Sequence, residues 1–151
     1  MVHTASPCPV AVPKNENELI KPAVDGTLAV MRACHKNKVQ RVVITSSCSA
    51  IYKSKDPKKT HFTPDDWSYT DGALPYEKSK TLAEKAAWDF IADLPEHEKF
   101  EVVTINPGLV LGPNLVSCQF SSGDVVKQIM YTGVRGLPHV TMPLIDVRDV
   151  A

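Results

Sequence analysis

A tyrosine and a lysine four positions apart, Tyr76 and Lys80, carry the clearest chemical signal in the sequence. Side chains at i and i+4 share one face of a helix, so the phenol and the ammonium can approach the same molecule. Free tyrosine has a pKa of about 10, and a nearby fixed cation lowers that pKa by stabilising the phenolate. With a hydroxyl such as that of Ser47 beside the phenol, this set predicts acid–base chemistry on an alcohol or carbonyl oxygen while another group exchanges a hydride.

Each of these features also has an ordinary structural explanation when it is taken alone. A lone Tyr-x-x-x-Lys pair is more often an exposed helix face than a catalytic pair. Ser46 and Ser47 fit caps at the end of a strand, and Pro107-Gly108 fits a turn. Only their joint order and spacing favour catalysis.

The elements that must position these residues alternate between helix and strand. Apolar residues recur at intervals of three and four in the expected helices, and β-branched runs mark strands that are covered on both faces. The polar, Lys- and Asp-rich stretch 53–73 predicts a surface loop. The expected helices span about 16–35, 75–92 and 123–131, and the expected strands lie at 2–4, 39–47, 100–113 and the start of 141–151.

This alternation predicts an α/β fold with a parallel sheet, because parallel strands need helical crossovers. Ligands of such sheets bind at the carboxyl ends of the strands. Three short segments fall there: residues 4–6, 45–47 and 106–108. We therefore expect them to meet at one edge of the sheet.

Composition excludes several other classes of protein. The 151 residues suit about one domain, with 43% hydrophobic and 23% charged residues, and the 17 basic residues balance the 17 acidic ones. This balance argues against a nucleic-acid or anionic-membrane binder, and no apolar run is long enough to span a membrane. The beginning of the chain lacks a signal-peptide pattern, so the four cysteines (Cys8, Cys34, Cys48 and Cys118) are expected to be reduced thiols in the cytoplasm.

Taken together, six stretches resemble an extended short-chain dehydrogenase/reductase of the dihydroflavonol reductase and cinnamoyl-CoA reductase type. They cover nearly the whole chain: VHTASP (2–7), ENELIKPAVDGTLAVMRAC (16–34), RVVITSSCSAIY (41–52), YEKSKTLAEKAAW (76–88), INPGLVLGP (105–113) and IDVRDVA (145–151). The resemblance implies a partial Rossmann-type, doubly wound parallel sheet over residues 1–151, and an enzyme that uses NADP or NAD to reduce a ketone or aldehyde, or to oxidise the alcohol.

The resemblance also implies roles for individual residues. Ser47 orients the substrate oxygen, Tyr76 donates or accepts the proton, and Lys80 holds the nicotinamide ribose and tunes the tyrosine. Ser46 is the alternative to Ser47, because neighbouring strand positions point in opposite directions. The residues expected to border the cofactor are Thr4, Ala5, Ser6, Pro107, Gly108 and Leu109.

The chain departs from this family pattern in two places. Many members carry Asn at the position of Asp25, which puts a proton relay through that position in doubt. None of the seven glycines forms the phosphate-binding fingerprint that holds a dinucleotide at a helix N-terminus. We therefore expect an internal piece of a longer enzyme, lacking the first strands, the glycine loop and most of the C-terminal substrate region. Folded alone, such a piece is expected to bind the cofactor weakly.

Other functions remain open from the sequence. The same fold also serves non-catalytic dinucleotide-binding or scaffold proteins. A hydrolase that uses Ser47 or Cys48 ranks low because a G-x-S-x-G elbow is absent, and scattered Cys and His residues argue against a metal site. The 53–73 loop and residues 114–122 are expected to border a small-molecule pocket, where Trp67 and Tyr69 stack on a flat substrate or simply pack. The substrate and the oligomeric state cannot be read from the sequence.

Overall fold

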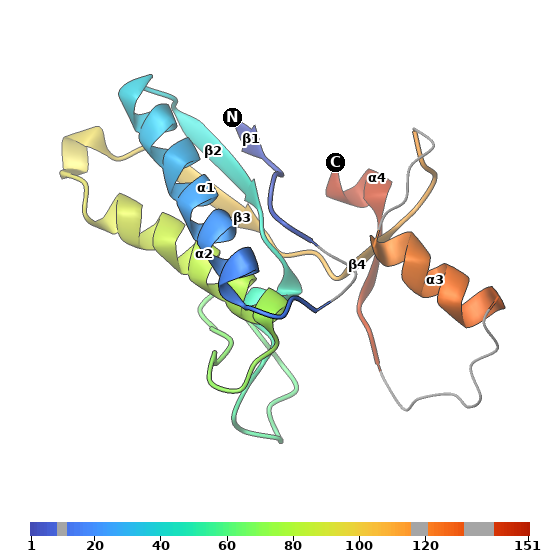
Figure 1. Ribbon diagram of the computed structural model, residues 1–151. Coiled ribbons are helices and arrows are strands. Elements are labelled where there is room, and N and C mark those ends of the chain that lie inside the picture. The colour runs from blue at the N-terminus through green and yellow to red at the C-terminus, as the bar shows by residue number, and fades with distance from the viewer. Residues whose placement is uncertain (9–11, 116–120, 132–140) are drawn as a thin grey trace. The chain divides into compact units, whose positions relative to one another are not determined.

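The computed structural model describes residues 1–8, 12–115, 121–131 and 141–151, and the chain divides into two compact units, Met1–Asn106 and Pro107–Ala151. The first unit contains β1 (Val2–His3), α1 (Asn17–Lys36), β2 (Arg41–Thr45), the 3-10 turn η1 (Cys48–Ala50), α2 (Pro75–Ala92), the 3-10 turn η2 (Glu96–Glu98) and β3 (Glu101–Ile105) (Figure 1). The second unit contains β4 (Leu109–Leu111), α3 (Ser121–Tyr131), β5 (Leu144–Asp146) and α4 (Val147–Val150).

The sheet of the first unit is parallel, with the strand order β1-β2-β3. Strands β2 and β3 pair along all five residues, from Arg41 opposite Glu101 to Thr45 opposite Ile105. Strand β1 adds only Val2 and His3 at the edge, opposite residues 43 and 44 of β2. These parallel pairings confirm the predicted α/β fold and bring the ends of β2 and β3 to the same edge of the sheet.

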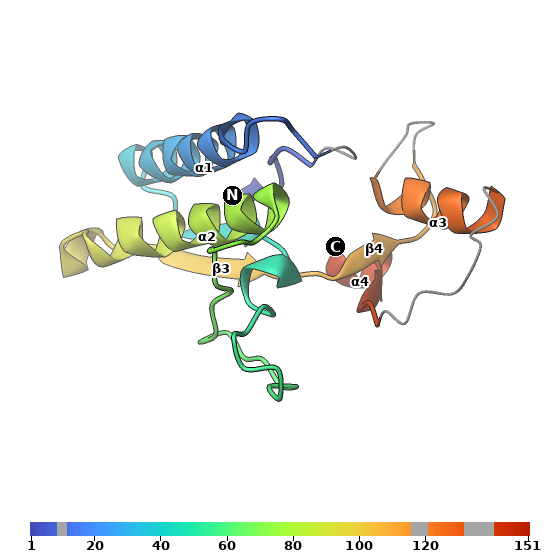
Figure 2. The same cartoon turned by 60° about the horizontal axis from the view of Figure 1, so that its bottom comes forward.

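Both long helices of this unit cover the same face of the sheet (Figure 2). Val42 and Ile44 of β2 point into the layer between sheet and helices, because alternate strand residues share a face. Their buried cluster is completed by Met31, Cys34 and Ala87. On the opposite face, Val103 and Ile105 are each more than one-third exposed.

Helix α2 begins and ends where the sequence pattern predicts, at residues 75 and 92. Pro75 occupies its first position, where the missing N–H costs nothing. The Glu77 carboxylate accepts a hydrogen bond of 2.9 Å from the backbone N–H of Leu74 and so closes the first turn. Helix α1 runs through Pro22, and the chain leaves it at Lys38, whose φ of 54° is unusual for a residue other than glycine.

The prediction of a single strand over residues 100–113 is wrong. In the structure this stretch forms two strands, β3 and β4, which belong to different sheets and different units. Pro107 lies at the break, and a proline has no N–H with which to continue a strand ladder. Strand β4 pairs in parallel with β5 instead, from Leu109 opposite Leu144 to Leu111 opposite Asp146.

Candidate active site

Helix α2 places Tyr76 and Lys80 on successive turns, near the carboxyl end of β2. The Lys80 ammonium lies 5.6 Å from the centroid of the Tyr76 ring, and the Lys80 residue is only 7% exposed. Among the described residues, the Lys80 ammonium has neither an ion pair nor a hydrogen bond. The pair therefore lies together, as the i,i+4 spacing predicts, with Lys80 buried and Tyr76 half-buried.

Ser47 follows β2 and begins the turn η1. Its hydroxyl oxygen accepts a hydrogen bond of 3.2 Å from the backbone N–H of Ser49, which fixes the side chain. Ser47 also lies close enough to Tyr76 to lower the pKa of its phenol. The structure thus brings the three predicted catalytic side chains, Ser47, Tyr76 and Lys80, into one place.

The expectation that Lys80 lowers the pKa of Tyr76 is wrong for this chain by itself. Burial and, to a smaller extent, the nearby Cys8 raise the pKa of Tyr76 to about 12, and Ser47 only partly opposes this rise. Burial also lowers the pKa of Lys80 itself, and Cys8 partly opposes that shift. Desolvation disfavours the charged form of each group, and it is the largest cause of both pKa shifts. At neutral pH the Tyr76 phenol is therefore protonated.

Ser46, the alternative to Ser47, points in the opposite direction and contacts a different group. Its hydroxyl donates a hydrogen bond to Oε2 of Glu84, a buried residue of α2. The same oxygen accepts a hydrogen bond of 2.8 Å from Nδ2 of Asn106. Ser46 therefore faces the helix layer, whereas Ser47 faces Tyr76.

The predicted cofactor-binding residues of the first unit lie beside Lys80. Ser6 and Ala5 line a small cavity of about 10 Å³ together with His3, Lys80 and Glu84. The Ser6 hydroxyl is the only buried side-chain polar atom in the described part of the chain that lacks a hydrogen-bond partner. A buried hydroxyl without a partner is costly, so this position suits contact with a polar ligand or a water molecule.

Thr4, the third predicted residue of this segment, is exposed and lines an open cleft of about 640 Å³ with Ala5 and Ser6. Pro107, Gly108 and Leu109 belong to the second unit, where the Leu109 N–H donates to the Pro143 carbonyl over 2.8 Å. Their predicted place beside the cofactor stays a prediction.

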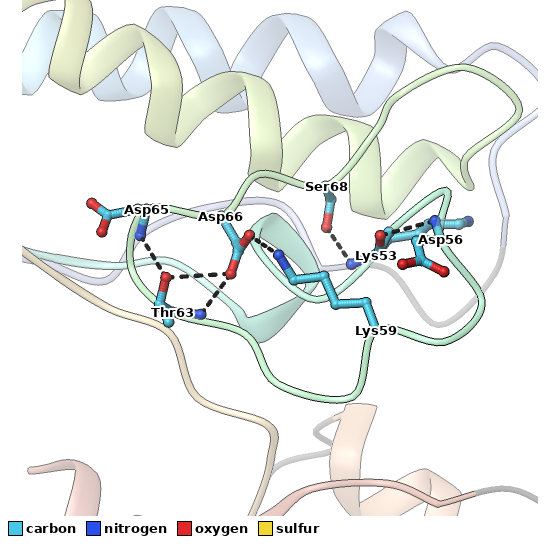
Figure 3. A network of polar contacts seen from close by, with 8 residues as sticks. Lys53, Asp56, Lys59, Thr63, Asp65, Asp66 and Ser68 are labelled. Atoms are coloured by element: carbon cyan, nitrogen blue, oxygen red, sulfur yellow. Dashed lines mark hydrogen bonds and ion pairs between the residues drawn. The ribbon is translucent and has the colours of Figure 1, made fainter.

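The 53–73 loop is tied together by its own polar side chains (Figure 3). Lys59 pairs with Asp66, whose other oxygen accepts a hydrogen bond of 2.8 Å from the Thr63 N–H. The Lys53 N–H donates to the Ser68 hydroxyl over 2.9 Å, and the Ser68 N–H donates to the Ala50 carbonyl over 2.8 Å. The first bond joins the two ends of the loop, and the second joins the loop to η1, which follows Ser47 directly.

The aromatic rings of this loop contact lysines of the chain itself. The Lys85 ammonium lies 5.1 Å from the Trp67 ring centroid, and the Lys53 ammonium lies 5.4 Å from that of Tyr69. Packing with lysines therefore accounts for both rings, and their stacking on a substrate stays a prediction.

Several contacts of the site were not found by sequence reasoning. Cys8 lies close enough to Tyr76 and Lys80 to influence both, although its Pro-flanked segment predicts only a loop. Glu77 and Glu84 lie on the same helix as Tyr76, and only their burial distinguishes them from surface carboxylates. Asp25, by contrast, is exposed and pairs with Lys21 over 2.7 Å, away from the cavity beside Lys80.

Two further properties concern ions and membranes. Within the described ranges, no group of three or more His, Cys, Asp or Glu side chains is arranged to hold a metal ion. None of the helices described is both long and apolar enough to cross a bilayer. Cys34 and Cys48 are free thiols, and Cys118 lies outside the described residues.

Comparison with known proteins identifies the class to which this fold and site belong. Residues 1–134 match the family model of the 3-beta hydroxysteroid dehydrogenase/isomerase family. The chain therefore belongs to this family of extended short-chain dehydrogenases/reductases, which confirms the resemblance noted from the sequence.

Individual relatives point to reductases within this family. The chain is 36% identical to cinnamoyl-CoA reductase CAD2 of Medicago truncatula, over 99% of this chain and 46% of the relative. It is 31% identical to the NADPH-dependent methylglyoxal reductase GRE2 of Saccharomyces cerevisiae, over 100% of this chain and 49% of the relative. The crystal structure of Gre2 from Candida albicans in complex with NADPH superimposes with a TM-score of 0.79 at 33% identity, covering 99% of this chain and 49% of Gre2. The chain thus spans about half the length of these relatives.

Proposed function

We propose that this chain supplies the catalytic side chains of an NADPH-dependent reductase that acts on a ketone or aldehyde, or oxidises the corresponding alcohol. The observation that carries the proposal is the Tyr76 phenol, which lies beside both Ser47 and Lys80 and is protonated at neutral pH. NADPH is preferred over NADH because relatives of this chain are NADPH-dependent or were solved with NADPH. The predicted cytoplasmic location and small-molecule substrate belong to the same proposal.

The residues present fit the nicotinamide end of such a cofactor. The Lys80 ammonium and the Ser6 hydroxyl are polar groups without a hydrogen-bond partner among the described residues, and both line the cavity at the carboxyl ends of β1 and β2. We assign Lys80 to the ribose hydroxyls and the segment Thr4–Ser6 to the neighbouring edge of the cofactor. Pro107, Gly108 and Leu109 are assigned to the nicotinamide side from the family resemblance. When bound, the cofactor supplies the hydride.

The chain's own residues supply the position and the proton. The Ser47 hydroxyl donates to the carbonyl oxygen of the substrate and holds it beside the Tyr76 phenol. As the carbonyl carbon gains the hydride, its oxygen gains the phenolic proton of Tyr76, and the product is the alcohol. A pKa of about 12 keeps this proton on the tyrosine until the oxygen becomes basic. The nearby Lys80 ammonium then stabilises the phenolate until solvent returns the proton.

The proposal is tested with Tyr76→Phe in a full-length form of the protein that includes this chain. General acid catalysis contributes about 10²–10⁴-fold, so turnover of NADPH with methylglyoxal or with small aromatic aldehydes is expected to fall by that factor. The affinity for NADPH, measured by calorimetry, is expected to stay within about threefold, because the ring remains and only the acid is lost.

The matched control is Tyr131→Phe, which removes only the hydroxyl of a tyrosine that is 80% exposed on α3. Its turnover is expected to equal that of the wild type. Unchanged turnover in Tyr76→Phe would overturn the assignment of Tyr76. Tight NADPH binding by a wild-type protein that reduces no carbonyl compound would favour the non-catalytic alternative instead.

A further inference from the structure

We propose that Glu84 is a positioning residue for Ser47, whose buried carboxylate holds the carboxyl ends of β2 and β3 against α2. The inference rests on the proposed function, because it concerns catalysis only if the Ser47 hydroxyl works on the substrate oxygen. Glu84 shares the lining of the small cavity with Lys80 and Ser6, but its hydrogen bonds run to Ser46 and Asn106, so we infer that it acts on Ser47 through Asn106.

The connection runs through one amide group. Asn106 follows β3 directly, and its Nδ2 donates to Oε2 of Glu84 over 2.8 Å and to the backbone carbonyl of Ser47 over 3.1 Å. A side-chain amide nitrogen carries two hydrogens, so it can make both bonds at once. The Glu84 carboxylate fixes the Asn106 amide, and the amide fixes the backbone of Ser47.

A second connection reaches the neighbouring residue of the same strand end. The Ser46 hydroxyl donates to the same Oε2 of Glu84, and the Ser46 N–H donates to the Ile105 carbonyl over 2.8 Å. Glu84 thus holds both serines, Ser46 directly and Ser47 through the Asn106 amide. Because successive side chains of an extended segment point in opposite directions, fixing Ser46 against Glu84 also fixes the direction of the Ser47 side chain.

The helix register makes this arrangement relevant to catalysis. Glu84 lies one turn after Lys80 and two turns after Tyr76 on α2, so one rigid helix carries both the acid and the anchor of Ser47. The distance between the Ser47 hydroxyl and the Tyr76 phenol then depends on the Glu84 contact. Misplacement by about 1 Å is enough to lower a rate by about 10²-fold.

Packing alone does not explain a carboxylate at this position. Glu84 is 5% exposed, and none of the ion pairs within the described part of the chain includes it. Burying a carboxylate without a cation is costly, whereas an apolar side chain fills the same volume without that cost. Two donors that converge on one oxygen require an acceptor, and a carboxylate oxygen is purely an acceptor.

A double-mutant cycle in the full-length form tests the inference. Glu84→Ala is measured in the wild-type and Ser47→Ala backgrounds, with NADPH and methylglyoxal, or with whichever small ketone or aldehyde the wild type reduces fastest. If Glu84 acts through Ser47, we expect Glu84→Ala to lower kcat by about 10-fold or more in the first background and by less than about 2-fold in the second. The affinity for NADPH is measured in all four proteins, because Glu84 lines the same cavity as Lys80 and Ser6; a fall in kcat at saturating NADPH separates positioning of Ser47 from loss of cofactor binding.

Thr81→Val is the matched control for a loss of stability. Thr81 is buried on the same helix, and its hydroxyl donates to the Glu77 carbonyl over 2.8 Å, which is not one of the contacts that hold Ser46, Ser47 or Asn106. Its melting temperature is expected to fall while kcat stays within about 2-fold of the wild type. Asn106→Ala repeats the cycle if Glu84→Ala does not fold, because it breaks the same connection at the next residue.

The outcomes separate the two proposals. An equal fall in kcat on removing Glu84 with and without Ser47 would overturn the positioning role and leave the proposed function intact. A Ser47→Ala protein with wild-type kcat would overturn the role of Ser47 in the proposed function, and the role of Glu84 with it. Glu84→Gln should retain more activity than Glu84→Ala, because the amide oxygen can still accept from Ser46 and Asn106; the reverse order would also count against the inference.

Discussion

Replacing Glu77 with alanine tests how the catalytic helix is held at its first turn. The Glu77 carboxylate, only 8% exposed as a residue, accepts hydrogen bonds from three donors. They are the Lys53 ammonium at 2.6 Å, the Leu74 N–H at 2.9 Å and the Tyr52 hydroxyl at 3.1 Å. The change therefore releases the 53–73 loop from α2 and opens the turn that carries Tyr76.

The expected cost follows from these three contacts. Loss of a helix-capping bond costs about 0.5–2 kcal/mol, which applies to the Leu74 N–H. A hydrogen bond to a charged group contributes about 1.5–3 kcal/mol, but 24% of the Lys53 side chain is exposed, so water replaces part of that contact. Tyr52 is 43% exposed and loses little for the same reason. We expect Glu77→Ala to lower the free energy of unfolding by about 2–3 kcal/mol at pH 7.

This cost is expected to depend on pH. Burial by itself raises the pKa of Glu77, but the hydrogen bonds from Lys53 and Leu74 outweigh it and leave the pKa below the ordinary value of 4.5. A carboxyl group with a lowered pKa in the folded state stabilises the protein above its unfolded pKa and loses that contribution as the pH falls through the folded value. The difference between wild type and Glu77→Ala should therefore be full at pH 7 and shrink below about pH 4.

Urea unfolding of the full-length form at pH 7 and at pH 3.5 measures both effects, with Glu16→Ala as the control. Glu16 pairs with Lys78 over 2.7 Å, but its side chain is 44% exposed, so its loss is expected to cost at most about 1 kcal/mol. Equal costs for the two variants at pH 7, or a Glu77→Ala cost that does not change with pH, would refute this account of the first turn.

Three further predictions concern other parts of the chain. Lys80→Met should weaken NADPH binding in calorimetry and raise the pKa of His3 in an NMR titration, because burial and the Lys80 charge together lower that pKa; an unmoved His3 resonance would contradict it. Gly108→Ala should lower the free energy of unfolding, measured in urea, by about 1–3 kcal/mol, since a Cβ there lies 2.2 Å from the Pro143 carbonyl oxygen; an unchanged free energy of unfolding would contradict this. Lys38→Gly should raise the free energy of unfolding by up to about 1 kcal/mol because glycine accepts a φ of 54° without strain, so a lower melting temperature would count against this explanation.

The helices were predictable because their information is local. The apolar spacing and Pro75 placed α2 at the bounds that it has, and the i,i+4 rule placed Lys80 beside Tyr76. The parallel sheet followed from the alternation of helix and strand. The break at Pro107 was missed because the β-branched pattern continues on both sides of it.

The polar contacts of the site were not predictable because they join distant segments. Asn106 reaches Ser47 across 59 positions and Glu84 across 22 positions, and no local pattern marks either contact. The direction of the Tyr76 pKa shift was missed for a related reason. Spacing on a helix shows that a cation is near, but only the packed structure shows that burial is the larger effect.

The closure of the 53–73 loop has a consequence for how such a protein diversifies. The bonds from Lys53 and Ser68 fasten both ends of residues 54–67, whose remaining polar groups mainly satisfy one another. Since the entropy of loop closure grows only slowly with length, insertions or deletions between these fastening points cost the scaffold little. This segment is therefore where new sequence can be accepted during evolution, or in a randomised library, while Ser47 and α2 keep their geometry.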